Sequence, residues 1–278
     1  MKIFKTKKSL SAYLNLLEEK ISIGFVPTMG AIHDGHLKLI EISKKQCRKT
    51  ICSIFINPTQ FDNKEDYKKY PKKLDEDYIK LQQASCDLVY SPEVCDLYKK
   101  NETAKTFNFK TLGLSMEGKF RHNHFDGVAT VIEKLFQIIK PTKAYFGEKD
   151  IQQLQIVKSL VTQINSKTVI IGVPTVREKN GLAMSSRNKL LSFEEKEKAT
   201  IIYNCLNYCR NNKHLSISKL KKYVIKQFNK AEDIHLEYVE FVSLNNMQPI
   251  VKWKKEKNNA ICIAAYINKV RLIDNIIL

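Results

Sequence analysis

The apolar positions in the first part of the chain fall into two alternating patterns. Short continuous apolar runs predict buried strands, and apolar residues three or four positions apart predict helices between them. Strands that alternate with helices in this way form βαβ units, so the pattern predicts a parallel sheet covered by helices. The strands are expected at residues 21–26, 50–56, 88–90, 144–146 and 169–171, and the main helices at 9–19, 37–44, 78–84, 128–139 and 151–160.

The pattern changes after residue 176. Longer amphipathic stretches and a few strand-like runs then predict a small α+β domain. We therefore expect an α/β protein with a Rossmann-like doubly wound parallel sheet domain at residues 1–175 and a smaller α+β C-terminal domain at residues 176–278. In the second domain, helices are expected at residues 193–211 and 216–231, and strands at 236–242, 260–266 and 270–274.

Polar side chains gather in four turns that follow predicted strands. In open α/β sheets, ligands bind at the carboxyl ends of the strands, so we expect these turns to line one site. The residues concerned are His33 and His36, then Asn57 and Gln60, then Lys149, Asp150 and Gln153, and finally Ser185, Ser186 and Arg187.

The first of these turns lies within residues 24–40, where an apolar strand, a glycine-containing turn and a helix start follow one another. The N-terminus of a helix favours anions such as phosphate. His33 and His36 are three positions apart, so they share a helix face and can donate hydrogen bonds to a phosphate that gains charge. A structural pair and a metal-binding pair remain alternatives, although two histidines without a third ligand are weak evidence for zinc.

The other turns carry complementary chemistry. Lys149, Arg187 and the serine hydroxyls suit a polyphosphate, Asp150 can accept ribose hydroxyls, and the two glutamine amides suit a small polar acid. Neither a Walker A motif nor G-x-G-x-x-G occurs, so a nucleotide site here uses other machinery. Taken singly, Lys149 and Arg187 are more typical of solvated surface charges, and Ser185 and Ser186 of a turn or helix cap. Together they favour nucleotidyl transfer, in which an acid attacks the α-phosphate and pyrophosphate leaves.

Charge and cysteine content narrow the class of protein. The net charge is +18, but only six of the 47 basic residues are arginine and the lysines are spread along all 278 residues. This distribution favours a solvated basic surface, which attracts anionic small substrates, over a nucleic-acid-binding groove. The seven cysteines are odd in number and contain no C-x-x-C pair, so we expect a reducing cytoplasm. No apolar run suits a membrane span or a signal peptide.

The motifs also resemble a known family. Residues 27–36, which end in His33-Asp34-Gly35-His36, resemble the HxGH signature of the nucleotidyltransferase superfamily, and residues 184–187 look like the matching KMSKS-type loop. More narrowly, the chain is similar to the pantoate–β-alanine ligase (pantothenate synthetase) family from its first strand to its end. That similarity rests on residues 53–61, 70–71, 145–154, 172–188 and 271–275.

The resemblance implies an AMP-forming ligase that condenses pantoate with β-alanine to give pantothenate, AMP and pyrophosphate through a pantoyl adenylate. It implies Mg²⁺ with ATP as co-substrate, and a homodimer with neither a nucleic-acid nor a membrane partner. The first domain would bind nucleotide and pantoate, and the second would close over the ATP site. The alternatives are an adenylyltransferase of the same superfamily acting on another small metabolite, and a nucleic-acid-binding module.

The resemblance also assigns roles to individual residues. His36 would be the proton donor, His33 and Lys149 would contact phosphate, and the Ser185–Ser186–Arg187 loop would close over the triphosphate as part of the catalytic set. Pantoate would be held by Gln60 and Gln153, with Asn57 and His124 beside them. ATP would bind Met29, Gly30, Ala31, Ile32, His33, Asp34, Gly35, His36, Gly147, Glu148, Lys149, Asp150, Val176, Met184, Ser185, Ser186 and Arg187.

The resemblance does not assign a role to every position of the expected site. The family usually has glycine and arginine where this chain has Asn123 and Asp126, which puts the role of that turn in doubt. Residues 101–119 are expected to be irregular, as a flap over a site would be. The protein ligands of Mg²⁺ are unknown, and Asp75, Glu76 and Asp77 are candidates by position only.

Overall fold

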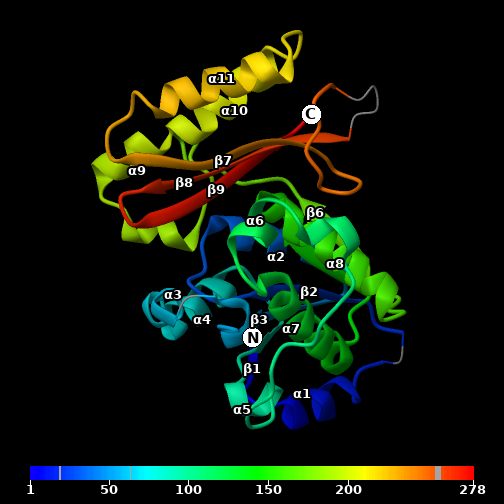
Figure 1. Cartoon of the computed structure of the whole chain (residues 1–278). Coiled ribbons are helices and arrows are strands. Elements are labelled where there is room, and N and C mark those ends of the chain that lie inside the picture. Colours follow the sequence, from blue (N-terminus) through cyan, green and yellow to red (C-terminus); the bar gives the residue numbers. More distant parts are fainter. Residues whose placement is uncertain (19, 63, 254–257) are drawn as a thin grey trace. The chain divides into compact units, whose positions relative to one another are not determined.

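The computed structural model describes residues 1–18, 20–62, 64–253 and 258–278 (Figure 1). The chain forms two compact units. The first comprises residues 1–109, 121–147 and 156–173, and the second comprises residues 110–120, 148–155 and 174–278. The predicted division of the chain into domains at residues 1–175 and 176–278 stays a prediction.

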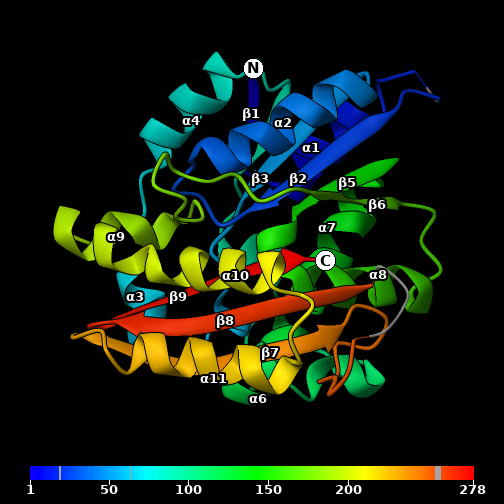
Figure 2. The ribbon, with the colours of Figure 1, turned by 90° about the horizontal axis from the view of Figure 1, so that it is seen from above.

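A six-stranded parallel sheet organises the first unit; the apolar runs predict the parallel sheet and five of its strands, but not β1. The strand order is β1-β4-β3-β2-β5-β6, and every neighbouring pair is parallel. Figure 2 shows these strands from above. Their bounds are β1 (Lys2–Phe4), β2 (Ile23–Thr28), β3 (Lys49–Ile54), β4 (Leu88–Tyr90), β5 (Lys143–Gly147) and β6 (Val169–Val173).

Helices cover both faces of this sheet, which confirms the doubly wound fold. On one face, Val26 and Cys52 belong to a buried cluster with Ile40 of α2 and Leu81 of α4. On the other face, the ring of Phe25 packs edge-on against Phe136 of α7. The helices are α1 (Lys7–Leu14), α2 (Asp34–Gln46), α3 (Lys64–Lys69), α4 (Leu74–Gln83), α5 (Val94–Leu97), α7 (His124–Ile139) and α8 (Ile151–Gln163), whose first residues belong to the second unit.

The strand order contains a topological switch point. From β2 the chain continues through α2 to β3 on one side, whereas from β5 it continues through α8 to β6 on the other. The carboxyl ends of β2 and β5 therefore mark the position at which open α/β sheets bind ligands. The turns that follow β2, β3 and β5 carry three of the four polar groups identified in the sequence.

The second unit is built on an antiparallel sheet of β7 (Ile234–Ser243), β8 (Asn259–Ile267) and β9 (Val270–Ile277), in that order. Helices α9 (Phe193–Ala199), α10 (Ile201–Asn211) and α11 (Ile217–Phe228) pack on it through one apolar cluster. The α+β character is confirmed. The single helix predicted at residues 193–211 is wrong, because it is two helices that meet at Thr200.

One segment predicted as irregular contains helices. Residues 110–120 form a 3₁₀ helix, η2 (Lys110–Gly113), and α6 (Met116–Phe120), and they pack in the second unit. Arg271 of β9 holds α6 there by two 2.7 Å hydrogen bonds to the carboxylate of Glu117, which also accepts from the Tyr238 hydroxyl. Long-range ion pairing, and not local sequence, therefore assigns this segment to the second unit.

None of the helices in the described ranges combines the length and the apolar character needed to cross a membrane.

The seven thiols are expected to react very unequally. Only Cys95 is exposed, and burial raises the pKa of Cys86 and of Cys205 to about 12. Since the thiolate is the reactive form, a disulfide reagent at neutral pH should modify one thiol rapidly in the folded protein and all seven after unfolding. Counting released thiolate by absorbance checks this. Cys95→Ser should abolish the fast phase, and fast modification of several thiols in the native state would contradict the described core.

Candidate active site

The turn after β2 is built around a buried carboxylate. Gly30 and Ala31 both have positive φ, at 81° and 52°, so successive backbone N–H groups converge on one point. Asp77 of α4 lies at that point. Its two oxygens accept from the N–H groups of Ala31 and Ile32, each at 2.7 Å, and Asp77 is only 1% exposed. An added Cβ at Gly30 would lie 2.9 Å from Asp77 Oδ2, so glycine is required there.

His33 and His36 face each other at the start of α2. His33 is the N-cap residue, and its carbonyl accepts from the backbone N–H of His36 at 2.8 Å. The imidazole rings stack, with centroids 4.0 Å apart and an interplanar angle of 24°. Both residues are half-buried and Asp34 is exposed. The predicted pairing of the two imidazoles at a helix N-terminus is thus present.

The turn after β3 contacts the turn after β2 through a side-chain hydrogen bond. Asn57 is the N-cap residue of the 3₁₀ helix η1 (Pro58–Gln60) and Gln60 is its last residue; they are 1% and 8% exposed. Asn57 Nδ2 donates to Gln60 Oε1 at 3.1 Å, and Gln60 Nε2 donates to Met29 Sδ at 3.1 Å. The Tyr98 hydroxyl donates to Asn57 Oδ1 at 2.8 Å, and burial raises the pKa of Tyr98 to about 12, so it remains a donor at neutral pH. The amide of Gln60 is therefore held in one orientation.

The start of α7 supports the same turn. His124 is 7% exposed, and its Nδ1 lies 2.8 Å from the carbonyl oxygen of Gln60. Asn123 adopts a left-handed conformation with φ 53°, which glycine and asparagine tolerate best. Asp126 Oδ1 accepts from the N–H of Phe107 at 3.0 Å. Both departures from the family pattern thus have a local role: Asn123 keeps the backbone conformation, and Asp126 anchors the segment before residue 110.

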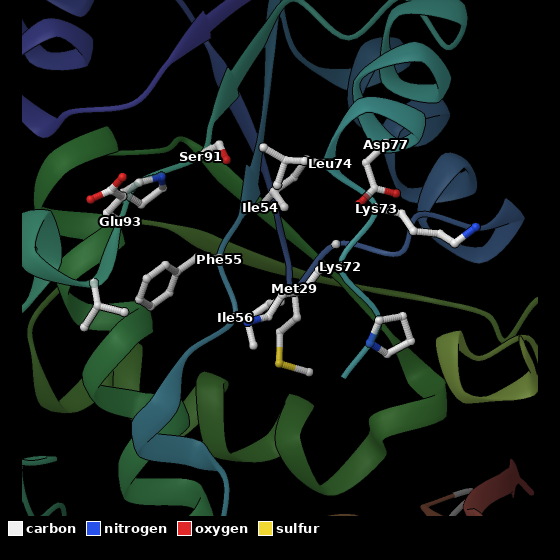
Figure 3. A pocket seen from close by; sticks show the side chains of 14 residues that line it. Met29, Ile54, Phe55, Ile56, Lys72, Lys73, Leu74, Asp77, Ser91 and Glu93 are labelled. Carbon is white, nitrogen blue, oxygen red and sulfur yellow. The ribbon is translucent and has the colours of Figure 1, made fainter. Parts of the chain in front are cut away.

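A cavity of about 390 Å³ opens beside the turn after β2, at the carboxyl ends of β3 and β4 (Figure 3). Its wall is mainly apolar, and the Met29 side chain and the Asp77 carboxylate both border it. The lining residues are Met29, Gly30, Ile54, Phe55, Ile56, Pro71, Lys72, Lys73, Leu74, Asp77, Ser91, Pro92, Glu93 and Val94.

In the second unit, the segment after β5 forms the 3₁₀ helix η3 (Glu148–Asp150) and leads into α8. Lys149 Nζ lies 3.6 Å from Asp150 Oδ1, and the Lys149 side chain is 17% exposed. Gln153 is half-buried, whereas its neighbour Gln152 is 3% exposed. Gln152 Nε2 donates to the carbonyls of residues 112 and 115, so it is an anchor for the 110–120 segment. Sequence reasoning singled out Gln153 and missed this role of Gln152.

The loop with the two serines is also internally braced. The backbone N–H of Met184 donates to the carbonyl of Val176 at 2.9 Å, which closes a short antiparallel bridge between Arg177 and Ala183. Ser185 caps the 3₁₀ helix η4 (Ser186–Leu190), and its Oγ accepts from the N–H of Arg187 at 3.3 Å. The loop therefore has a defined backbone in the second unit.

The predicted site residues fall into two groups. The first unit brings together His33, His36, Asn57, Gln60 and His124, and the second carries residues 148–153, 176 and 184–187. Their meeting in one site stays a prediction. No group of three metal-ligating side chains occurs in the part of the chain that the structure describes.

Replacing Gly127 by alanine should destabilise the turn after β3. Alanine usually stabilises a helix, but a Cβ at Gly127 of α7 would lie 2.2 Å from the carbonyl oxygen of Thr59. We expect Gly127→Ala to lower the free energy of unfolding by about 1–3 kcal/mol, measured by urea denaturation. Gly113→Ala is the matched control, because no heavy atom lies within 4 Å of its added Cβ. Unchanged or higher stability of Gly127→Ala would contradict the described contact.

Comparison with known proteins gives one consistent result. The family model for Pantoate-beta-alanine ligase matches residues 2–277. Pantothenate synthetases from Azobacteroides pseudotrichonymphae and Flavobacterium psychrophilum are 46% and 43% identical, and each alignment covers 99% of this chain and 99% of the relative.

Solved structures agree. A crystal structure of pantothenate synthetase from Thermus thermophilus is similar with a TM-score of 0.93 and 35% identity, over 100% of this chain and 99% of that one. A pantoate-beta-alanine ligase from Francisella tularensis, complexed with beta-gamma ATP and beta-alanine, is similar with a TM-score of 0.84 and 37% identity, over 100% and 97%. Sequence motifs, fold and full-length similarity agree, and the chain belongs to the pantoate–β-alanine ligase family.

Proposed function

We propose that the protein is a ligase that condenses pantoate with β-alanine, at the expense of ATP, to give pantothenate, AMP and pyrophosphate. The observation that carries this proposal is the family match over residues 2–277. The Francisella relative, which is named for this activity, was solved with beta-gamma ATP and beta-alanine. An adenylyltransferase acting on another metabolite is not favoured by any of these similarities.

In the first step, a carboxylate oxygen of pantoate attacks the α-phosphorus of ATP. The bond to the bridging oxygen of the β-phosphate breaks, and pyrophosphate leaves with the electron pair. His33 and His36 would donate hydrogen bonds as charge grows on the α-phosphate oxygens, supported by the positive end of the α2 dipole. Lys149 and the Ser185–Arg187 loop would hold the triphosphate, and residues 147–150 with Val176 would hold adenosine.

In the second step, the β-alanine amine attacks the carbonyl carbon of pantoyl adenylate. The C–N bond forms, the bond to the phosphate oxygen of AMP breaks, and the amine loses a proton. Gln60 and Gln153 would orient the pantoate part. The Gln60 amide suits this role because its position is fixed. Asn57 Nδ2 donates to its side-chain oxygen, and His124 Nδ1 is within hydrogen-bond distance of its backbone carbonyl. Keeping the acyl adenylate in a closed site would protect it from water.

Two of the three carboxylates suggested as magnesium ligands have other partners. Glu76 accepts from Lys73 at 2.6 Å, and Asp77 accepts from the turn after β2. These contacts do not fit a site made by the three acidic side chains. Mg²⁺ would instead bind mainly through triphosphate oxygens and neutralise their charge, as is common for this ion.

Two further properties belong to the proposal. A homodimer is expected from the family resemblance and is checked by light scattering of the purified protein. A cytoplasmic location is expected because all seven cysteines are free thiols.

The purified protein with pantoate, β-alanine and Mg-ATP should form pantothenate and pyrophosphate in equal amounts. His36→Ala should lower kcat by about 10²–10³-fold, because it removes a donor to the charge that develops on the α-phosphate. Its thermal unfolding should be unchanged. His122→Ala, at an exposed position, is the matched control. Absence of product with folded wild-type protein would overturn the function, and a normal kcat for His36→Ala would remove His36 from the mechanism.

Asp77→Asn should also impair the first step, although this side chain lies behind the turn. An amide offers one acceptor oxygen where two N–H groups converge, and its NH₂ faces a donor, so the turn that leads into His33 must shift. We expect kcat for pyrophosphate release to fall at least about tenfold, since small misplacements of reacting groups have large effects on rate. Exposed Asp75, on the same helix, provides the control Asp75→Asn. Equal effects of the two variants would favour a shared metal role over the anchoring role of Asp77.

A further inference from the structure

Two consecutive polar residues of strand β9, Asp274 and Asn275, have no place in the proposed chemistry. Each is 4% exposed. Buried polar side chains are retained where they satisfy specific hydrogen-bonding groups. Successive side chains of a strand point to opposite faces, so these two residues can serve different partners from one rigid position.

Asn275 holds the segment after β5 by its backbone. Its Nδ2 donates to the carbonyl oxygens of Glu148 and Lys149, at 2.8 and 2.7 Å. The amide has two hydrogens, so one side chain satisfies both of these carbonyls, two of the three in η3. Because the contacts are to the backbone, the Lys149 ammonium remains available for a phosphate.

Asp274 braces the segment that leads into the serine loop. Its carboxylate forms a two-pronged pair with Arg177, with Nη1–Oδ2 and Nη2–Oδ1 distances of 2.5 and 3.0 Å. Arg177 also donates to the carbonyl of Gly181 at 3.1 Å, across the bridge that precedes Met184. The guanidinium carbon of Arg177 lies over the ring of Tyr203, 4.2 Å from the ring centroid. The guanidinium is therefore fixed on several sides.

We infer that Asp274 and Asn275 are positioning residues that hold the two loops of the second unit, residues 148–150 and 176–187, in register with each other. This inference rests on the proposed function, in which both loops bind ATP. A two-residue span of a paired strand provides a stiffer spacer than the loops themselves, since β9 pairs with β8 along its whole length. The spacer thus sets the distance between Lys149 and Arg187, which both contact the triphosphate in the proposed function.

Asn275→Asp tests the inference. The carboxylate is nearly isosteric but faces two carbonyl oxygens without a proton to donate, so η3 must move. We expect KM for ATP to rise about tenfold in pantoate-dependent ATP–pyrophosphate exchange, while KM for β-alanine in the full reaction stays within about twofold of wild type. Asn212→Asp is the matched control, because it removes one amide-to-carbonyl bond, to Tyr208, at the end of α10 in the same unit.

A general loss of structure would move both KM values or lower the yield of folded protein, and would not produce this split. If Asn275→Asp is not folded by near-UV circular dichroism, Asn275→Ser replaces it, since its hydroxyl keeps one donor and the same split is expected. A wild-type KM for ATP in the folded variant overturns the inference. Lys149→Ala distinguishes failure of this inference from failure of the proposed function. A wild-type KM for ATP in that variant would refute the proposed ATP-binding loop itself.

Discussion

The pairing of the Asp77 carboxylate with two backbone N–H groups determines the geometry of the polar turn after β2 in the first unit. Convergent N–H groups at a left-handed turn form an anion site, and in many proteins a phosphate occupies it. Here an internal carboxylate from α4 occupies it. Buried N–H groups need acceptors, so Asp77 holds the turn in this course. The start of α2, and with it the stacked pair of His33 and His36, follows from this constraint.

A continuous set of contacts extends from that turn through the first unit. Met29 accepts from Gln60, Gln60 accepts from Asn57, and the carbonyl of Gln60 meets His124. Gly127 lets α7 approach the same turn at a distance that excludes a side chain. The Gln60 amide, which is proposed to orient pantoate, is therefore positioned by a network that includes the turn before His33 and His36, the proposed phosphate donors. Such a network favours a fixed distance between nucleophile and α-phosphate, which is what a near-attack geometry requires.

Five of the six strands of the first unit, their parallel pairing and the polar turns that follow them could be predicted, because strands buried on both faces have continuous apolar runs and their carboxyl ends collect ligand groups. The short strand β1 was missed. Other features depend on distant contacts. Asp75, Glu76 and Asp77 look alike in sequence, and only burial against the turn distinguishes Asp77. The interruption between α9 and α10 at Thr200 contains neither glycine nor proline, the residues that usually signal a helix end in a sequence. Residues 110–120 are held in the second unit by distant partners, among them Gln152 and Arg271, the latter about 150 positions along the chain, which no local pattern could show.

In both units, a buried polar side chain on a regular element fixes the backbone of a loop, and the side chains of that loop are the ones proposed to contact substrates. The loops proposed to contact substrates are shaped through their backbones by a buried polar side chain on a regular element, Asp77 of α4 in one unit and Asn275 of β9 in the other. A positioning group of this kind acts on backbone conformation, so the side chains of the loop remain available for chemistry. The same logic explains how Asn123 and Asp126 can stand where the family usually has glycine and arginine. Asn123 adopts the left-handed backbone before α7, a conformation that glycine also tolerates, and Asp126 accepts from the N–H of Phe107, so both side chains act on the backbone around His124.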